Sequence, residues 1–199
     1  MNEAVILAKK ISASRQKQIK PLEEKINRLL VQVGMPNARI KVDINIETEL
    51  NQFGIDVIDF LFDANKSGQF QPVRKVASGG ELSRLMLCIK SLVAQSIDLP
   101  TMIFDEIDTG ISGEAARQVG NIMKELSASH QLISITHQPQ IAAKATAHYF
   151  VYKAIEKDTI VTSIRLLSND ERITTIAQML SGEKPTAAAL QNAREMVGN

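Results

Sequence analysis

The apolar residues of this chain recur first at helical and then at strand spacing. Residues 2 to about 33 have helical spacing and end before Gly34 and Pro36, which predicts one long helix. Residues 39–46 alternate apolar and polar positions, and residues 55–62 do so less cleanly, so an antiparallel strand pair is expected there. The chain is therefore expected to open with a helix followed by a small sheet.

Further along, helical patterns alternate with short apolar runs. One run follows Pro100 and a second precedes His137, each flanked by helical spacing, as is typical of interior strands of a parallel sheet. This alternation predicts an α/β fold with a mainly parallel sheet. The expected elements are helices at 78–96, 113–128, 169–180 and 185–197, a short helix after Pro139, strands at 101–104 and 131–136, and a hairpin of 148–153 with 159–166 turning at 157–158.

A small hydroxyl and two glycines stand at the start of one predicted helix. In Ser78-Gly79-Gly80-Glu81 the first turn has backbone N–H groups without helical partners, and the helix dipole is positive there, so a phosphate could bind. The same four residues also fit a capping box, in which Ser78 and Glu81 satisfy each other's backbone donors. Both interpretations stay open on this segment alone.

Polar side chains follow two of the predicted strands. Asp105 and Glu106 come directly after the strand 101–104, and His137 ends the next strand, so all three are expected at the carboxyl edge where open α/β sheets bind ligands. Taken singly, two loop carboxylates are most often solvated, and a lone histidine is most often a surface or core residue. Their order along the chain favours a nucleotide site.

Together these segments resemble the nucleotide-binding heads of ABC-type ATPases, in particular the SMC-like branch with its bacterial DNA repair members. Residues 77–81 resemble the signature motif and residues 101–106 resemble Walker B. Residues 109–112 occupy the D-loop position, and His137 occupies that of the switch histidine. The likeness runs through most of the chain.

The resemblance implies ATP and Mg²⁺ as ligands. It implies that Asp105 supports Mg²⁺ through a water molecule, that Glu106 is the general base, and that His137 senses the γ-phosphate. The signature residues Ser78, Gly79, Gly80 and Glu81 are implied to contact ATP held by the opposing head of a homodimer.

In the D-loop segment Asp108, Thr109, Gly110 and Ser112, the last residue departs from the aspartate common in the wider superfamily. That departure removes the usual carboxylate for communication between two sites, a role for which Asp108 and Thr109 are the candidate substitutes.

The pattern G-x-x-x-x-G-K-[ST], which wraps nucleotide phosphates, does not occur in the sequence. In the family this Walker A loop lies on an N-terminal lobe that is joined through a long coiled coil. We therefore expect residues 1–33 to be the end of a returning coiled-coil arm and residues 34–199 to be the C-terminal lobe of the head. The missing N-terminal lobe, a second head and DNA are the implied partners, and the chain by itself is expected to be inactive as an ATPase.

Composition and charge exclude some classes of protein. The 199 residues are 44% hydrophobic, which excludes a disordered chain, and no apolar run is long enough to span a membrane. Cys88 is the only cysteine and lies on a helical pattern, so a reducing cytoplasmic location at the nucleoid fits. The net charge of +1 identifies no partner, and the basic first helix is expected to be a solvated flank, with DNA contact as the alternative.

Two other functions remain as alternatives. A nucleotide-binding subunit of a membrane transporter usually carries Pro-Thr after the acidic pair, whereas this chain has Ile107-Asp108. A non-catalytic module with the ABC shape would have lost catalytic residues, whereas Glu106 and His137 are both present. The sequence therefore favours a head segment of an SMC-like DNA repair ATPase.

Overall fold

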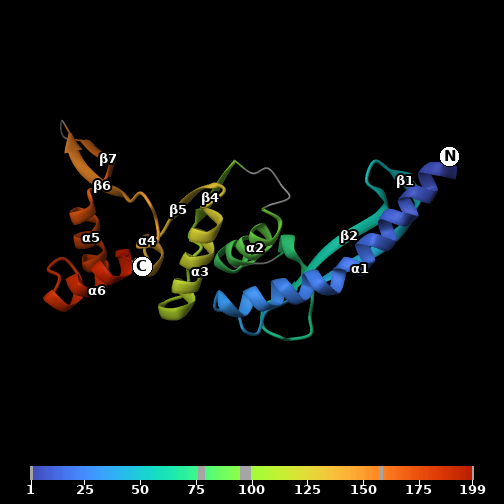
Figure 1. The fold of residues 1–199 in the computed structure, drawn as a ribbon, viewed down its shortest axis with the longest axis horizontal. Helices are drawn as coiled ribbons and strands as arrows, with labels where there is room; N and C mark the ends of the chain where they lie inside the picture. The colour runs from blue at the N-terminus through green and yellow to red at the C-terminus, as the bar shows by residue number, and fades with distance from the viewer. Residues whose placement is uncertain (1, 76–78, 95–99, 157–158, 199) are drawn as a thin grey trace. The chain divides into compact units, whose positions relative to one another are not determined.

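A computed structural model describes residues 2–75, 79–94, 100–156 and 159–198, which form two compact units. The first unit runs through residue 99 and the second begins at Pro100. The first unit combines a long helix, an antiparallel sheet and a second helix (Figure 1). Its elements are α1 (Asn2–Gln32), β1 (Arg39–Asn51), β2 (Gly54–Asp63), β3 (Gln71–Pro72), the 3₁₀ helix η1 (Val73–Lys75) and α2 (Gly79–Val93).

Helix α1 confirms the predicted long helix and packs on β1 and β2. It ends where Gly34 takes a positive φ of 79°, a conformation that glycine adopts without strain. Ile26, Leu30 and Val33 are fully buried. Ile26 and Leu30 lie on the face of α1 that packs on the sheet, whereas Leu29 is only partly buried.

The predicted antiparallel pair is confirmed, and both strands are longer than expected. The ladder of β1 and β2 continues from Ile46↔Asp56, through an irregularity, to Asn51↔Gly54. Apolar alternation could not predict the added part of β1, because residues 47–51 are mostly polar. On the other side of β1, the Ile40 and Val42 N–H groups donate to side chains of α1, which satisfies the strand's outer edge.

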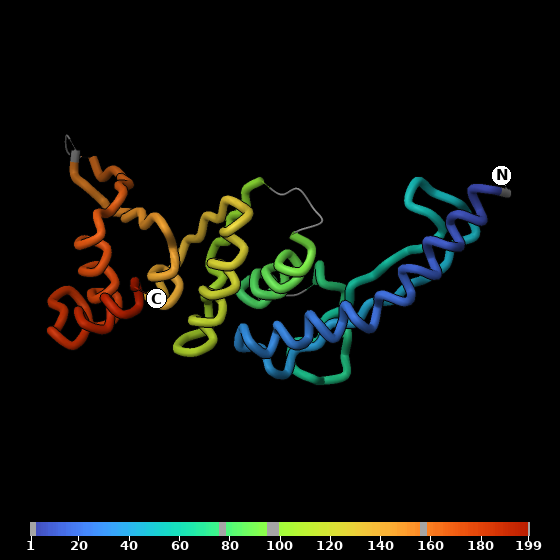
Figure 2. The backbone as a smooth tube through the Cα atoms, in the orientation of Figure 1, coloured from blue at the N-terminus to red at the C-terminus, as the bar shows by residue number. Residues whose placement is uncertain are grey.

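The second unit contains a parallel strand pair, a hairpin and four helices among its described residues (Figure 1). Figure 2 shows its chain passing from β4 through α3 into β5. Its elements are β4 (Thr101–Asp105), α3 (Gly113–Leu126), β5 (Gln131–Ile135), α4 (Pro139–Ala142), β6 (Tyr149–Glu156), β7 (Thr159–Leu166), α5 (Asn169–Ser181) and α6 (Ala187–Gly198). The predicted turn at 157–158 lies outside the described residues.

Helix α3 forms where the helical period predicted it, and its inward positions Ala116, Val119, Met123 and Leu126 are all buried. Helix α5 begins with a capping box in which the Ser168 hydroxyl accepts from the Glu171 N–H and the Glu171 carboxylate accepts from the Ser168 N–H.

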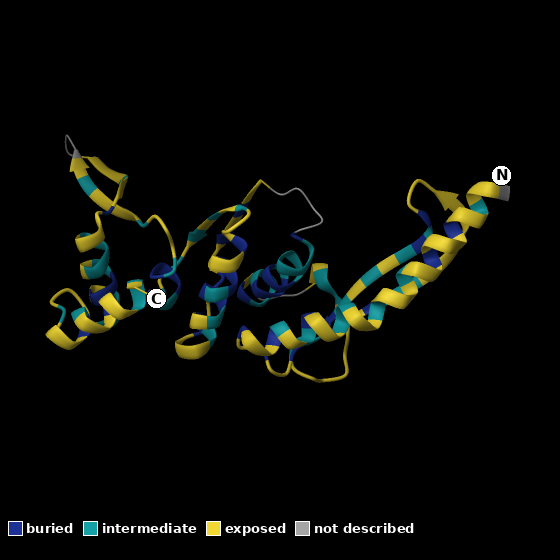
Figure 3. Cartoon of the chain, viewed as in Figure 1, coloured by how far each residue is buried: buried dark blue, intermediate teal, exposed yellow. Residues whose placement is uncertain are grey.

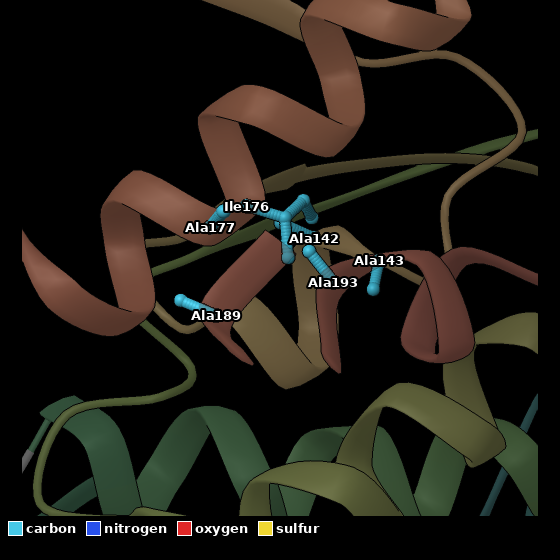
Figure 4. Close-up of a cluster of buried hydrophobic side chains, with 6 residues drawn as sticks. All are labelled: Ala142, Ala143, Ile176, Ala177, Ala189 and Ala193. Carbon is cyan, nitrogen blue, oxygen red and sulfur yellow. The ribbon is translucent and has the colours of Figure 1, made fainter. Parts of the chain in front are cut away.

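A cluster of small buried side chains holds α4, α5 and α6 together. Figure 4 shows Ile176 directed toward Ala142 and Ala193 at the junction of these helices. Because alanine side chains are short, they allow the helix backbones to approach closely. The members of the cluster are Ala142, Ala143, Ile176, Ala177, Ala189 and Ala193.

The hairpin of β6 and β7 exposes a largely apolar face, interrupted by the pair Lys153 and Thr162. In the register, Tyr149 pairs with Leu166, Val151 with Ile164, and Ile155 with Ile160, and all six side chains are exposed. The hairpin is accordingly coloured as mostly exposed in Figure 3. An apolar face of this kind is typical of a surface that another protein segment covers.

The fold is α/β, as predicted, with β4 and β5 as its parallel pair and two antiparallel sheets beside it. The division into an arm at 1–33 and a lobe at 34–199 stays a prediction. Among the described residues, no helix has the length and apolar character needed to cross a membrane.

Candidate functional site

Acidic residues and one histidine follow the carboxyl ends of the two parallel strands of the second unit. In the register of β4 and β5, Asp105 lies opposite Ile135, and these are the last residues of their strands. The chain therefore leaves both strands at the same edge, where Glu106 and His137 follow. The hydrophobic alternation fixes this arrangement, since Met102 and Phe104 are buried.

Glu106 adopts an uncommon backbone conformation. Its φ is 51°, in the left-handed region that side chains other than glycine, asparagine and aspartate rarely enter. The conformation closes a tight turn in which the Thr109 N–H donates to the Glu106 carbonyl at 3.2 Å. Holding a residue there costs on the order of 1–3 kcal/mol, and such outliers concentrate at functional sites. Both Asp105 and Glu106 are exposed, so either carboxylate can meet a ligand.

Asp108, in contrast, is completely buried. Its Oδ2 accepts the Thr136 hydroxyl and the backbone N–H groups of His137 at 3.0 Å and Gln138 at 3.2 Å. A buried carboxylate persists only with such donors around it. The carboxylate is thus engaged within its own chain, and a part for Asp108 in communication with a second head stays a prediction.

His137 projects its side chain outward from the end of β5. The imidazole is 70% exposed, and its Nδ1 lies 3.3 Å from Asp108 Oδ2. Asp108 thus lies beside one ring nitrogen, while most of the imidazole is open to solvent. Such a ring can exchange a proton or a hydrogen bond with a ligand at the strand edge.

The remaining D-loop residues form the approach to α3. Gly110 has a φ of 77°, which glycine tolerates, and Ser112 is the N-cap residue of α3. The Ser112 side chain makes no capping hydrogen bond, and both Ser112 and Thr109 are exposed. The segment therefore presents two hydroxyl-bearing residues at the surface.

The signature residues lie in the first unit, at the start of α2. Ser78 lies outside the described residues, so its predicted cap and phosphate roles are both untested. Gly79 and Gly80 are the first residues of α2, and Glu81 stands in its first turn. A Cβ added to Gly79 would meet no described atom within 4 Å, so the turn is open on that side. An open helix start fits an anionic ligand.

The chain offers single exposed carboxylates to a magnesium ion that would also bind waters and substrate phosphates. The described residues contain no group of three or more histidine, cysteine, aspartate or glutamate side chains arranged to hold a metal. Mg²⁺ commonly uses one or two carboxylates together with waters and substrate phosphates. The exposed Asp105 carboxylate at the strand end meets the protein's part of that requirement.

The structure thus brings Asp105, Glu106, Asp108 and His137 together in one unit. Sequence reasoning missed Thr136 and Gln138, which bind Asp108 and the Ile111 carbonyl respectively. A hollow of about 340 Å³ between α1 and the sheet of β1 and β2 is a different feature, with a mainly apolar lining that includes Ile11, Ile19, Leu22 and Phe60.

Comparison with known proteins shows which proteins this chain resembles. No family model matches the chain. It is 42% identical over 192 residues to the DNA repair protein RecN of Rickettsia typhi, and 37% identical over 195 residues to that of Deinococcus radiodurans. These alignments cover 96% and 98% of the chain, but in both cases 34% of the relative. The chain therefore spans about a third of the length of the curated relatives it matches.

Solved structures with a similar fold are SMC head domains. The Smc head domain with a coiled coil and joint from Pyrococcus yayanosii aligns with a TM-score of 0.58 and 16% identity, over 87% of this chain and 32% of that one. The Pyrococcus furiosus Smc head domain, solved with the C-terminal domain of ScpA, aligns with a TM-score of 0.52 and 15% identity, over 83% of this chain and 39% of that one. The chain is thus similar in sequence to about a third of RecN, and it shares its fold with part of the SMC head domains.

Proposed function

We propose that this chain is the C-terminal part of an ATP-hydrolysing head in a RecN-like protein of DNA double-strand break repair, acting in the cytoplasm at the nucleoid. The observation that carries the proposal is the shared carboxyl edge of β4 and β5, which brings Asp105, Glu106 and His137 together. The relatedness to RecN over nearly the whole chain supports the biological setting.

Each residue at this edge has a proposed role that suits its environment. Asp105 offers a carboxylate oxygen toward Mg²⁺ through a water molecule, and Glu106 takes the proton from the attacking water. His137 contacts the γ-phosphate with the side of its ring that faces away from Asp108. Bound Mg²⁺ would neutralise charge that develops on the phosphates.

The signature segment completes a second site rather than its own. Gly79 stands at the open start of α2, and this turn, with Gly80 and Glu81, would bind the γ-phosphate of ATP held by another head. The same role is proposed for Ser78, which precedes it in the sequence. In this arrangement each head supplies the acidic edge of one site and the signature of the other. The D-loop segment between β4 and α3, with Thr109, Gly110 and Ser112, would lie beside these sites.

The proposed partner for phosphate binding is an N-terminal lobe that carries the G-x-x-x-x-G-K-[ST] loop. Two exposed apolar surfaces of the second unit support such a partner. Ile103, Ile133 and Ile135 are exposed on the parallel pair, and the β6–β7 hairpin exposes its own apolar face. Surfaces like these are usually covered in the complete molecule.

The test compares the isolated chain with the full-length protein that contains both lobes. Because phosphoryl transfer depends on charge stabilisation around the phosphates, we expect Mg²⁺-dependent ATP turnover from the full-length protein and negligible turnover from the isolated chain. A full-length protein that neither binds nor hydrolyses ATP would refute the proposal and favour a non-catalytic module.

Ser78→Arg in the full-length protein tests the signature assignment. A bulky side chain at the start of α2 should leave ATP binding to one head nearly unchanged and block dimerisation and turnover. A simple helix cap predicts instead a stability loss of about 1 kcal/mol with normal turnover. ATP affinity, melting temperature and ATPase rate measured on one preparation separate these outcomes.

A further inference from the structure

The buried carboxylate of Asp108 has contacts that helix capping and turn formation do not explain. It lies in the segment between β4 and α3, and yet its Oδ2 bonds are made to three consecutive residues after β5: Thr136, His137 and Gln138. The two loops that leave the parallel pair are thus joined through one oxygen atom.

A second contact strengthens this junction. The Gln138 side-chain amide donates to the Ile111 carbonyl at 2.9 Å, and the Gln138 N–H also donates to the Thr136 hydroxyl at 3.0 Å. The backbone on both sides of His137 is therefore tied to the segment that follows Glu106. Because hydrogen bonds to a charged acceptor are roughly twice as strong as neutral ones, Asp108 is the dominant member of this network.

The other oxygen of the carboxylate indicates that stability alone does not explain the burial. Asp108 Oδ1 is also buried and has no hydrogen-bond partner among the described residues. An unpartnered buried oxygen is costly, so a loop shaped only for stability would favour a neutral or apolar residue here. The feature that a neutral apolar residue would lack is a carboxylate oxygen, Oδ2, held 3.3 Å from His137 Nδ1.

We propose that Asp108 is a positioning residue for His137: it holds the ring through Nδ1–H, so that Nε2 is the nitrogen presented at the carboxyl edge of β4 and β5. A hydrogen-bond acceptor beside one ring nitrogen determines which nitrogen carries the proton in the neutral ring. The side chain is 70% exposed, and the nitrogen that it presents to solvent is then Nε2, without a proton in the neutral ring. The catalytic consequence of this arrangement rests on the proposed function, whereas the ring orientation does not.

The orientation can be tested on this chain without nucleotide. Nitrogen-15 NMR of the histidine ring distinguishes the Nδ1–H from the Nε2–H form, and we expect the neutral His137 ring to carry its proton on Nδ1. Asp108→Asn keeps the shape and an oxygen acceptor but removes the charge, so the ring should shift toward the Nε2–H form. A wild-type ring that is already predominantly Nε2–H would overturn the proposal.

Thr136→Val is the matched control. It removes a donor to the same Asp108 oxygen while leaving the carboxylate and His137 in place. We expect the Nδ1–H form to persist in this variant. If Thr136→Val shifts the ring as much as Asp108→Asn does, the effect is a general loosening of the loop, and Asp108 has no specific role toward His137. The peptide circular dichroism spectrum of each variant establishes that it is folded.

Kinetics of the full-length protein test the catalytic consequence. We expect Asp108→Asn to lower kcat by roughly 10–100-fold with little change in KM for ATP, as for other residues that orient a functional histidine. Since Asp108 acts through His137, Asp108→Asn should have no further effect in a His137→Ala background. Independent, multiplying effects would overturn the positioning role. If His137→Ala leaves kcat unchanged while the NMR result holds, the proposed function of His137 fails and the positioning contact remains.

Discussion

Replacing Gly120 with alanine tests the packing of α3 against α4, which follows the segment that carries His137. Gly120 is buried in α3, and a Cβ at this position would lie 2.9 Å from the Gln140 carbonyl oxygen and 3.4 Å from the Ile141 Cα. Both neighbours are backbone atoms, so they cannot move aside as a flexible side chain would. Helix propensity alone predicts that Gly→Ala stabilises by about 1 kcal/mol. Overpacking against a fixed neighbour costs roughly 1–3 kcal/mol.

The cost of overpacking exceeds the gain in helix propensity, so we expect Gly120→Ala to lower the free energy of unfolding by about 1 kcal/mol. In thermal denaturation followed by circular dichroism this corresponds to a decrease in Tm of about 2–4 °C for a chain of this size. Gly198→Ala is the control, because a Cβ there meets no described atom within 4 Å and the exposed helix end should tolerate it. A rise in Tm for Gly120→Ala would show that α3 and α4 are not in this close contact.

Two further predictions concern the half-buried His148 and the buried Cys88. Burial, followed by the charge of Arg172, lowers the pKa of His148 from its ordinary value of 6.5. Its contribution to stability is therefore complete above that value and is lost as the pH falls toward the folded-state pKa. Tm measured between about pH 7.5 and 5 should fall less in His148→Asn than in the wild type, and identical profiles would contradict this assignment. Burial also raises the pKa of the Cys88 thiol to about 12, so an aromatic disulfide reagent should leave the native thiol unmodified and react after unfolding in guanidinium. Rapid reaction of the native chain would show that α2 does not bury Cys88.

Local patterns were sufficient to predict the long helix α1, the helix α3 and the β6–β7 hairpin. Their apolar spacing is regular, and Ala116, Val119, Met123 and Leu126, which recur at helical spacing in α3, are buried. The capping box of α5 is formed by Ser168 and Glu171, which lie three residues apart in the sequence. These elements depend mainly on neighbours in sequence.

The features that sequence reasoning missed depend on distant partners. The far end of β1 is polar and becomes a strand only because β2 folds back on it. Asp108 looks like a solvated loop carboxylate until β5 places Thr136 and two backbone N–H groups around it. No local pattern predicts such convergence, because the donors come from residues almost thirty positions away along the chain.

The same distinction applies to the candidate site as a whole. The order of strand, acidic pair, strand and histidine predicted that these side chains share one carboxyl edge. The register of β4 and β5 agrees, because Asp105 and Ile135, the last residues of the two strands, lie opposite each other. The relation of this edge to the signature segment of the first unit stays a prediction, since it concerns a second head and a lobe outside this chain.

The most direct measurement of the central claim is the ATP turnover rate of the full-length protein with Glu106→Gln. The amide keeps the size of the side chain but cannot take a proton from water, so kcat should fall roughly 10²–10⁴-fold while ATP binding is retained. Glu125→Gln, an equally conservative change at an exposed position on α3, should have the wild-type rate. Wild-type turnover in Glu106→Gln would contradict the account, because the edge of β4 and β5 would then not be where ATP is hydrolysed.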